Sequence, residues 1–247
     1  MTTVIEVPYH IDESLVDFES PLPADITVHY GEPPGPDRWS WLGSLYERVA
    51  DAVAGTDDLP VVVSGDCPVS LGTVAGLQRR GLDPAVVWFD AHGDVQSLET
   101  SHSGYLGGIP LRIMVGYRPE LVTTRLGLRP VPPERVVLVD ARDLDPPEVE
   151  FLATSAIRHV ELSTVESTVE LPDGPLYLHL DLDVVDPDQL PALLFPAPGG
   201  PSLTDLFGVV GAIMATGRVV GVGLACTWRP GHGSTDLVRP FVTSLLR

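Results

Sequence analysis

Apolar runs that end in acidic residues are the feature that most constrains the fold of this chain. Residues 85–89 are apolar, and Asp90, His92 and Asp94 follow them. Side chains two residues apart in an extended segment point to the same face, so these polar groups converge where a strand ends. Carboxylates with one imidazole suit a divalent cation such as manganese. An acidic turn that only caps a strand would give the same pattern, and the rest of the chain has to separate the two readings.

Strands rich in valine and leucine alternate with helical patterns along the chain. This predicts an α/β fold with a central, mainly parallel sheet flanked by helices. Strands are expected at 4–7, 59–63, 85–90, 135–139, 159–161, 176–182 and 219–224. Helices are expected at 39–53, 69–80, 110–116, 118–126, 148–154, 203–216 and 236–246. Without a repeat or a clear linker, residues 1–247 are expected to form a single domain.

The composition narrows the possible partners. The formal net charge is −19, and the chain has no lysine. Nucleic-acid and anionic-membrane binding are therefore not expected, and lysine-dependent Schiff-base chemistry is excluded. The two cysteines form no disulfide framework, and we find no signal peptide or membrane-spanning apolar run. A cytoplasmic protein with a small-molecule substrate is expected, and a homo-oligomer is possible.

Several expected strands end in polar or reactive residues, which a parallel sheet would bring to one edge. They fall at 66–67, 90–94, 143–145, 181–183 and 226–227. Asp181 and Asp183 share a face, and two buried carboxylates are costly unless a cation compensates them. Together with Asp90, His92 and Asp94 they could hold two cations that share bridging carboxylates. Such a pair of metals would make hydroxide available near neutral pH.

Three ordered motifs between about Val61 and Pro230 resemble the ureohydrolase family of arginase, agmatinase and formiminoglutamase. They are Ser-Gly-Asp-Cys-Pro at 64–68, Asp-Ala-His-Gly-Asp at 90–94, and Asp-Leu-Asp at 181–183 with Asp-Pro at 186–187. The resemblance implies a three-layer arginase-like fold and a dimanganese site. It implies the metal ligands Cys67, Asp90, His92, Asp94, Asp181 and Asp183. A metal-bound hydroxide would then attack a guanidino or amidino carbon.

Three departures from the family pattern concern the site itself. The first metal-binding histidine of the family falls at Cys67, whose softer thiolate suits zinc or iron better than manganese and could leave one of the two metal sites weak. The proton-shuttling histidine falls at Gly107. The glutamate that binds the guanidinium falls at Cys226 or Thr227.

Other family positions suggest how a substrate would be held. The resemblance assigns substrate contacts to Ser101, Ser103 and Tyr105, and it assigns contact with an α-amino group to Asp145. Asp145 equally fits a surface turn. Besides Asp94, His102 is a candidate catalytic residue, because it lies five residues before the vacated shuttle position; an exposed loop histidine is the alternative.

Two functions remain open. The combination of Cys67 with Gly-Tyr-Leu-Gly-Gly at 104–108 resembles the branch that hydrolyses N-hydroxy-arginine, so we expect an arginase-family amidinohydrolase acting on an amino acid or a cationic amidine. The alternative is a ureohydrolase-like protein without arginase activity, which binds a ligand or serves a structural role with a partial metal site. The retained acidic positions favour the enzyme, and the lost histidine and glutamate favour the alternative.

Overall fold

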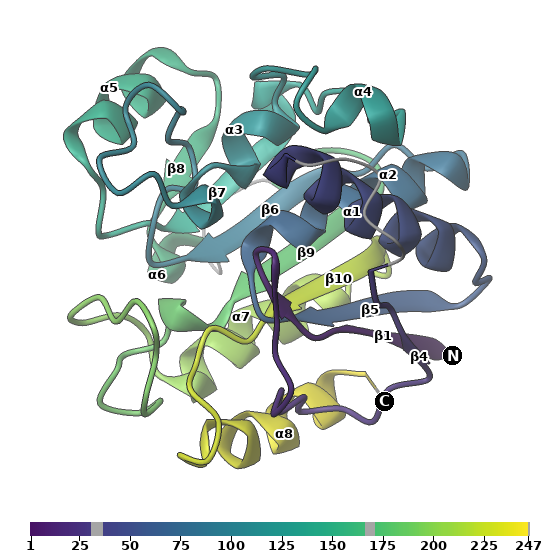
Figure 1. The fold of residues 1–247 in the computed structure, drawn as a ribbon. Coiled ribbons are helices and arrows are strands. Elements are labelled where there is room, and N and C mark those ends of the chain that lie inside the picture. Colours follow the sequence, from purple (N-terminus) through teal and green to yellow (C-terminus); the bar gives the residue numbers. More distant parts are fainter. Residues whose placement is uncertain (31–36, 166–170, 247) are drawn as a thin grey trace.

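The computed structural model describes residues 1–30, 37–165 and 171–246, and its centre is an eight-stranded parallel sheet (Figure 1). The strand order is β4-β1-β5-β10-β9-β6-β7-β8. The strands are β1 (Thr2–Val7), β4 (Ile26–Thr27), β5 (Leu59–Ser64), β6 (Ala85–Asp90), β7 (Val136–Asp140), β8 (Arg158–Val160), β9 (Leu176–Asp181) and β10 (Val219–Ala225). This is the α/β sheet that the sequence predicts.

Helices cover both faces of the sheet and complete three layers (Figure 1). They are α1 (Arg38–Ala54), α2 (Ser70–Arg79), α3 (Pro110–Met114), α4 (Thr123–Leu126), α5 (Pro146–Thr154), α6 (Leu162–Val165), α7 (Leu203–Met214) and α8 (Ser234–Leu245). In β6, Val86 and Trp88 pack in the core under α1 and α2, while Val87 and Phe89 pack in the core under α7 and α8. Because both faces of the strand are covered, it is apolar throughout.

Two local predictions need correction. The helix expected at 118–126 is only α4, because Arg118 has a φ of 43° and Val122 a φ of −142°, and neither value is that of a right-handed helix. A short antiparallel hairpin, β2 (Tyr9–His10) with β3 (Glu13–Ser14), was not predicted, since each strand has only two residues. No helix in the described ranges has both the length and the apolarity to cross a membrane.

The order of the strands brings the polar strand ends together. β5 and β6 are consecutive strands of the sequence, connected through α2, but β10 and β9 lie between them in the sheet. The register pairs Phe89 with Leu180, and Ala225 with both Asp181 and Ser64. Asp90 and Asp181 therefore end neighbouring strands at the same level, the edge where parallel sheets bind ligands.

Candidate metal centre

Asp90 and Asp181 begin two similar turns at the carboxyl edge of the sheet. Asp90 Oδ1 accepts a hydrogen bond from the backbone N–H of His92 at 2.7 Å, and Asp181 Oδ1 accepts one from the backbone N–H of Asp183 at 2.8 Å. An aspartate that bonds the backbone two residues ahead folds the chain into an Asx turn. Each turn brings its second polar residue, His92 or Asp183, back to the end of its strand.

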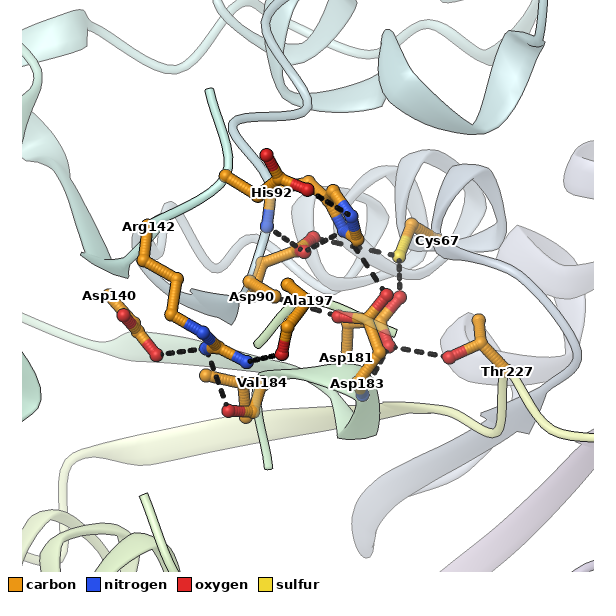
Figure 2. A network of polar contacts seen from close by, with 12 residues as sticks. Cys67, Asp90, His92, Asp140, Arg142, Asp181, Asp183, Val184, Ala197 and Thr227 are labelled. Atoms are coloured by element: carbon orange, nitrogen blue, oxygen red, sulfur yellow. Dashed lines mark hydrogen bonds and ion pairs between the residues drawn. The ribbon is translucent and has the colours of Figure 1, made fainter. Parts of the chain in front are cut away.

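The first donor group consists of Asp90, His92 and Asp183 (Figure 2). His92 Nδ1 lies 3.3 Å from Asp90 Oδ1 and 3.2 Å from Asp183 Oδ2. Both carboxylates are buried, while the His92 side chain is 30% exposed. One imidazole and two carboxylates are a suitable ligand set for a divalent transition metal.

The second donor group consists of Cys67, Asp90 and Asp181 (Figure 2). Cys67 Sγ lies 2.9 Å from Asp181 Oδ2 and 4.0 Å from Asp90 Oδ2. Thr227 Oγ1 donates to Asp181 Oδ1 at 2.7 Å and orients this carboxylate. Asp90 belongs to both groups, so the arrangement offers two adjacent cation positions with a shared carboxylate.

Asp94 faces the same cavity without belonging to either group. Its side chain is buried, and Oδ2 has no hydrogen-bond partner among the described residues. An unpaired buried carboxylate oxygen is costly, and a cation beside it would remove that cost. The residues present therefore fit a metal pair, with Asp94 as an additional oxygen ligand.

The charges of the metal-free cluster are poorly balanced. Burial raises the pKa of Asp94 and Asp181 well above the ordinary value, and the neighbouring carboxylates raise it further. Burial also raises the pKa of Asp183, to about 6. Burial opposes protonation of His92, but its bonds to Asp183 and Asp90 outweigh this and raise its pKa to about 12. The raised pKa values of the carboxyl groups show that the metal-free cluster disfavours its own negative charge. A bound cation would compensate this charge, and His92 would give up its proton to become a ligand.

A cavity of about 220 Å³ opens above the two donor groups. The sequence-predicted residues that line it are Cys67, Asp90, His92, Asp94, Ser101, Ser103, Tyr105, Asp145, Asp181 and Asp183. Eight carboxyl groups line it and no arginine does, so its chemistry suits a cation. His102 is exposed and is not among the residues that line the cavity.

Asp145 has a structural role as well as a place at the cavity. It caps α5 in a capping box, in which Glu148 Oε2 accepts from the Asp145 backbone N–H at 3.1 Å. Gln96 Nε2 also donates to Asp145 Oδ2 at 2.8 Å. Part of the hydrogen-bonding capacity of Asp145 is therefore already used within the protein, as is usual for an aspartate in a surface turn.

Three residues at or beside the cavity were not identified from the sequence. Glu148 is buried, and its Oε1 accepts from the Val95 backbone N–H at 3.2 Å, which holds the loop after β6. Phe195 lines the cavity from the proline-rich loop after β9. His10, from β2, does not line it but stacks on Tyr105, with ring centroids 5.6 Å apart. No local pattern marks them, because only the tertiary fold brings these distant segments to the cavity.

Arg142 links the loops beside the metal centre (Figure 2). It pairs with Asp140 and donates to the carbonyl oxygens of Val184 at 2.9 Å and Ala197 at 3.0 Å. The loop after β7 is thereby tied to the loop after β9. Arg142 consequently stabilises the walls of the cavity without lining it.

A parallel α/β sheet with two adjacent donor groups at its carboxyl edge defines an α/β protein with a candidate binuclear metal centre. The profile of the arginase family matches residues 11–227. The chain belongs to the arginase family.

Individual relatives agree with this assignment. The N(omega)-hydroxy-L-arginine amidinohydrolase of Streptomyces lavendulae is 33% identical over 211 residues, which are 80% of this chain and 74% of that protein. An arginase of Eremothecium gossypii is 32% identical over 197 residues, 72% of this chain but only 49% of its own length. The arginase structure from Bacillus caldovelox has a TM-score of 0.82 at 23% identity, covering 99% of this chain and 97% of that one. This likeness confirms the arginase-like fold.

Proposed function

We propose that this protein is a manganese-dependent hydrolase of a guanidino or amidino C–N bond. The observation that carries the proposal is the sharing of Asp90 between the Cys67–Asp90–Asp181 and Asp90–His92–Asp183 groups. Divalent cations held by these groups would lower the pKa of nearby water, so that hydroxide is available near neutral pH. Because of Cys67, the Cys67–Asp90–Asp181 group is a softer ligand set than one of oxygen and nitrogen atoms alone, and hence the weaker of the two positions for manganese.

The cavity favours a planar, cationic substrate group. Its carboxylates accept N–H bonds as a guanidinium offers them, and charge-assisted hydrogen bonds of this kind are strong. Ser101 and Ser103 add hydroxyl groups for the polar end of an amino acid, while Tyr105 and Phe195 supply aromatic walls. Of the relatives compared, the Streptomyces lavendulae protein is named for hydrolysis of N(omega)-hydroxy-L-arginine. We infer an N-hydroxyguanidino or guanidino amino acid as the substrate and the cytoplasm as the place of action.

A second candidate function is binding without hydrolysis. Thr227 contacts Asp181, and the resemblance places the guanidinium-binding glutamate of the family at Cys226 or Thr227. Neither a thiol nor a hydroxyl group binds a guanidinium as strongly as a carboxylate does. This observation favours a protein that binds a cationic ligand through its remaining carboxylates.

Product release from a substrate panel distinguishes the two functions. The manganese-loaded protein would be incubated with L-arginine, N-hydroxy-L-arginine, agmatine and guanidino acids, and urea and hydroxyurea would be measured. We expect release from at least one compound, abolished by a chelator and restored by manganese. Tight binding of a panel compound without any release by the metal-loaded protein would support the binding function and overturn the hydrolase.

A further inference from the structure

Tyr105 occupies the space next to Gly107 in the cavity wall. A Cβ atom at position 107 would lie 2.2 Å from Tyr105 Cε1 and 2.4 Å from its hydroxyl oxygen. The phenol of Tyr105 therefore fills the space that a side chain at position 107 would need. The neighbouring Gly108 has no such restriction, since the nearest atom to its Cβ would be Gln96 Cγ at 3.9 Å.

The hydroxyl group of Tyr105 connects the cavity with His10. It donates to Asp66 Oδ2 at 3.0 Å and lies 3.4 Å from His10 Nε2. The other ring nitrogen, His10 Nδ1, lies 3.2 Å from the carbonyl oxygen of Gly65 and 3.5 Å from Asp66 Oδ2. Because a carbonyl only accepts, Nδ1 carries a proton, so Nε2 faces Tyr105 and has a proton to give only when the ring is protonated at both nitrogens.

The fold holds this pair in place. The Gly65 backbone N–H donates to Tyr9 O at 3.2 Å, and a Cβ at position 65 would lie 2.7 Å from that oxygen, so a glycine lets β2 approach the end of β5. His10 and Tyr105 stack with ring centroids 5.6 Å apart, and Phe195 packs 4.9 Å from Tyr105. These aromatic contacts fix the distance between the phenol and the imidazole.

His10 also reaches beyond the cavity. Its side chain is 21% exposed, whereas that of Asp66 is 3% exposed. A second cavity of about 580 Å³, more open than the first, is lined by His10, Phe195 and Trp228. The contacts from Tyr105 to His10 therefore form a path from the candidate metal centre toward solvent.

We propose that Tyr105 and His10 deliver the proton that the leaving nitrogen needs when the C–N bond breaks, an inference that rests on the proposed function. As the bond breaks, its electron pair stays on nitrogen and takes the hydroxyl proton of Tyr105. The Tyr105 oxygen takes the Nε2 proton of protonated His10, and the neutral His10 recovers a proton from water. Tyr105 is the proton donor, His10 supplies it, and Asp66 orients both.

Conservative variants test this assignment. Tyr105→Phe and His10→Gln should each lower kcat about 100-fold with KM changed less than about threefold, the usual contribution of a general acid. The kcat of the double variant should fall no further than that of either single variant. Added imidazole should partly restore the kcat of His10→Ala. Tyr30→Phe removes a hydroxyl group that has no hydrogen-bond partner among the described residues and does not line the cavity, and it should retain full activity.

A glycine pair gives a second test. Gly107→Ala forces Tyr105 away and should cause a loss like that of Tyr105→Phe, while Gly108→Ala should not. A readout without metal or substrate is the ¹⁵N NMR spectrum of His10, in which Tyr105→Phe should shift Nε2 and leave Nδ1 nearly unchanged.

The outcomes distinguish a failure of the proton relay, meaning proton delivery by Tyr105 and His10, from a failure of the proposed function. If the wild type hydrolyses a substrate and Tyr105→Phe keeps its kcat, or if the losses in the double variant multiply, the relay is overturned and the hydrolase stands. If the metal-loaded wild type hydrolyses nothing while Nε2 still responds to Tyr105, the hydrolase is overturned, and with it the catalytic role of the pair. An Nε2 signal that does not respond to Tyr105→Phe contradicts the contact itself.

Discussion

The thiol of Cys67 lies 2.9 Å from the carboxylate of Asp181, and both side chains are buried at the carboxyl edge of the sheet. Burial raises the pKa of this thiol well above its ordinary value, and the charge of Asp181 raises it further. Without metal, the thiol is therefore a neutral donor to Asp181. A cation at this position would have to displace the proton, which couples metal binding to proton release.

Replacing Cys67 should remove one of the two metal positions. Cys67→Ala is expected to lower manganese content to about one ion per chain, because the Asp90–His92–Asp183 group remains. Elemental analysis of the dialysed protein measures the ratio. Cys226→Ala is the matched control, since Cys226 is also buried but belongs to neither donor group. Equal metal content in the two variants would show that Cys67 is not a ligand.

Thr227 should affect metal affinity through Asp181. Thr227→Val removes the 2.7 Å hydrogen bond to Asp181 Oδ1, and loss of such a supporting bond typically weakens metal binding about 10-fold or more. Thr227→Ser keeps the hydroxyl group and should retain affinity. Competition with a fluorescent chelator gives the manganese dissociation constant of each variant. Indistinguishable constants for Thr227→Val and Thr227→Ser would refute the role of the Thr227 hydroxyl group in supporting Asp181.

The metal-free protein should lose stability as the pH rises from about 4 to above 7. Burial raises the pKa of Asp183 to about 6, so protonation favours the folded state, and this contribution, complete below pH 3.8, fades up to pH 6. Burial raises the pKa of Asp94 well above its ordinary value, which extends the decline to higher pH. The pKa of His92, raised to about 12 by Asp183 and Asp90 against the effect of burial, acts in the same direction, because its contribution fades above pH 6.5.

Asp94→Asn tests this pH dependence directly. The amide cannot ionise, so urea unfolding of the metal-free variant should show a flatter decline with pH than the wild type. Asp188→Asn, at an exposed position in the loop after β9, should keep the wild-type slope. A slope unchanged by Asp94→Asn would mean that this carboxyl group is ionised and compensated without metal.

Glu148 should stabilise the loop that carries the metal ligands. Glu148→Ala removes acceptors for the backbone N–H groups of Val95 and Asp145 and should cost about 2 kcal/mol of unfolding free energy. Glu150→Ala, on an exposed position of the same helix, should cost less than about 0.5 kcal/mol. Similar urea midpoints for the two variants would exclude the proposed support.

The sequence predicts the framework of this site well because the framework is local. Each apolar strand and the polar turn after it are contiguous, so 85–94 and 176–183 indicate both the sheet and its reactive edge. Register and strand order then bring Asp90 beside Asp181. The arginase-like fold and the family are confirmed, while the ligand roles remain predictions.

What the sequence could not predict depends on contacts between distant segments. The sequence places Gly107 where the family has its proton-shuttling histidine, but nothing in it indicates that Tyr105 fills the space beside this glycine. No local pattern marks His10, because its neighbours Tyr105 and Asp66 are 95 and 56 residues further along the chain. His102, a candidate from its sequence position, is exposed instead.

The number of manganese ions bound by the metal-free protein tests the central claim most directly. Calorimetric titration near pH 7.5, checked by elemental analysis, should show two ions per chain, with unequal affinities because Cys67 serves only one position. Asp90→Asn should weaken both binding events, since Asp90 belongs to both donor groups. Binding of no manganese by the folded wild type, or two sites that Asp90→Asn leaves unchanged, would contradict the account.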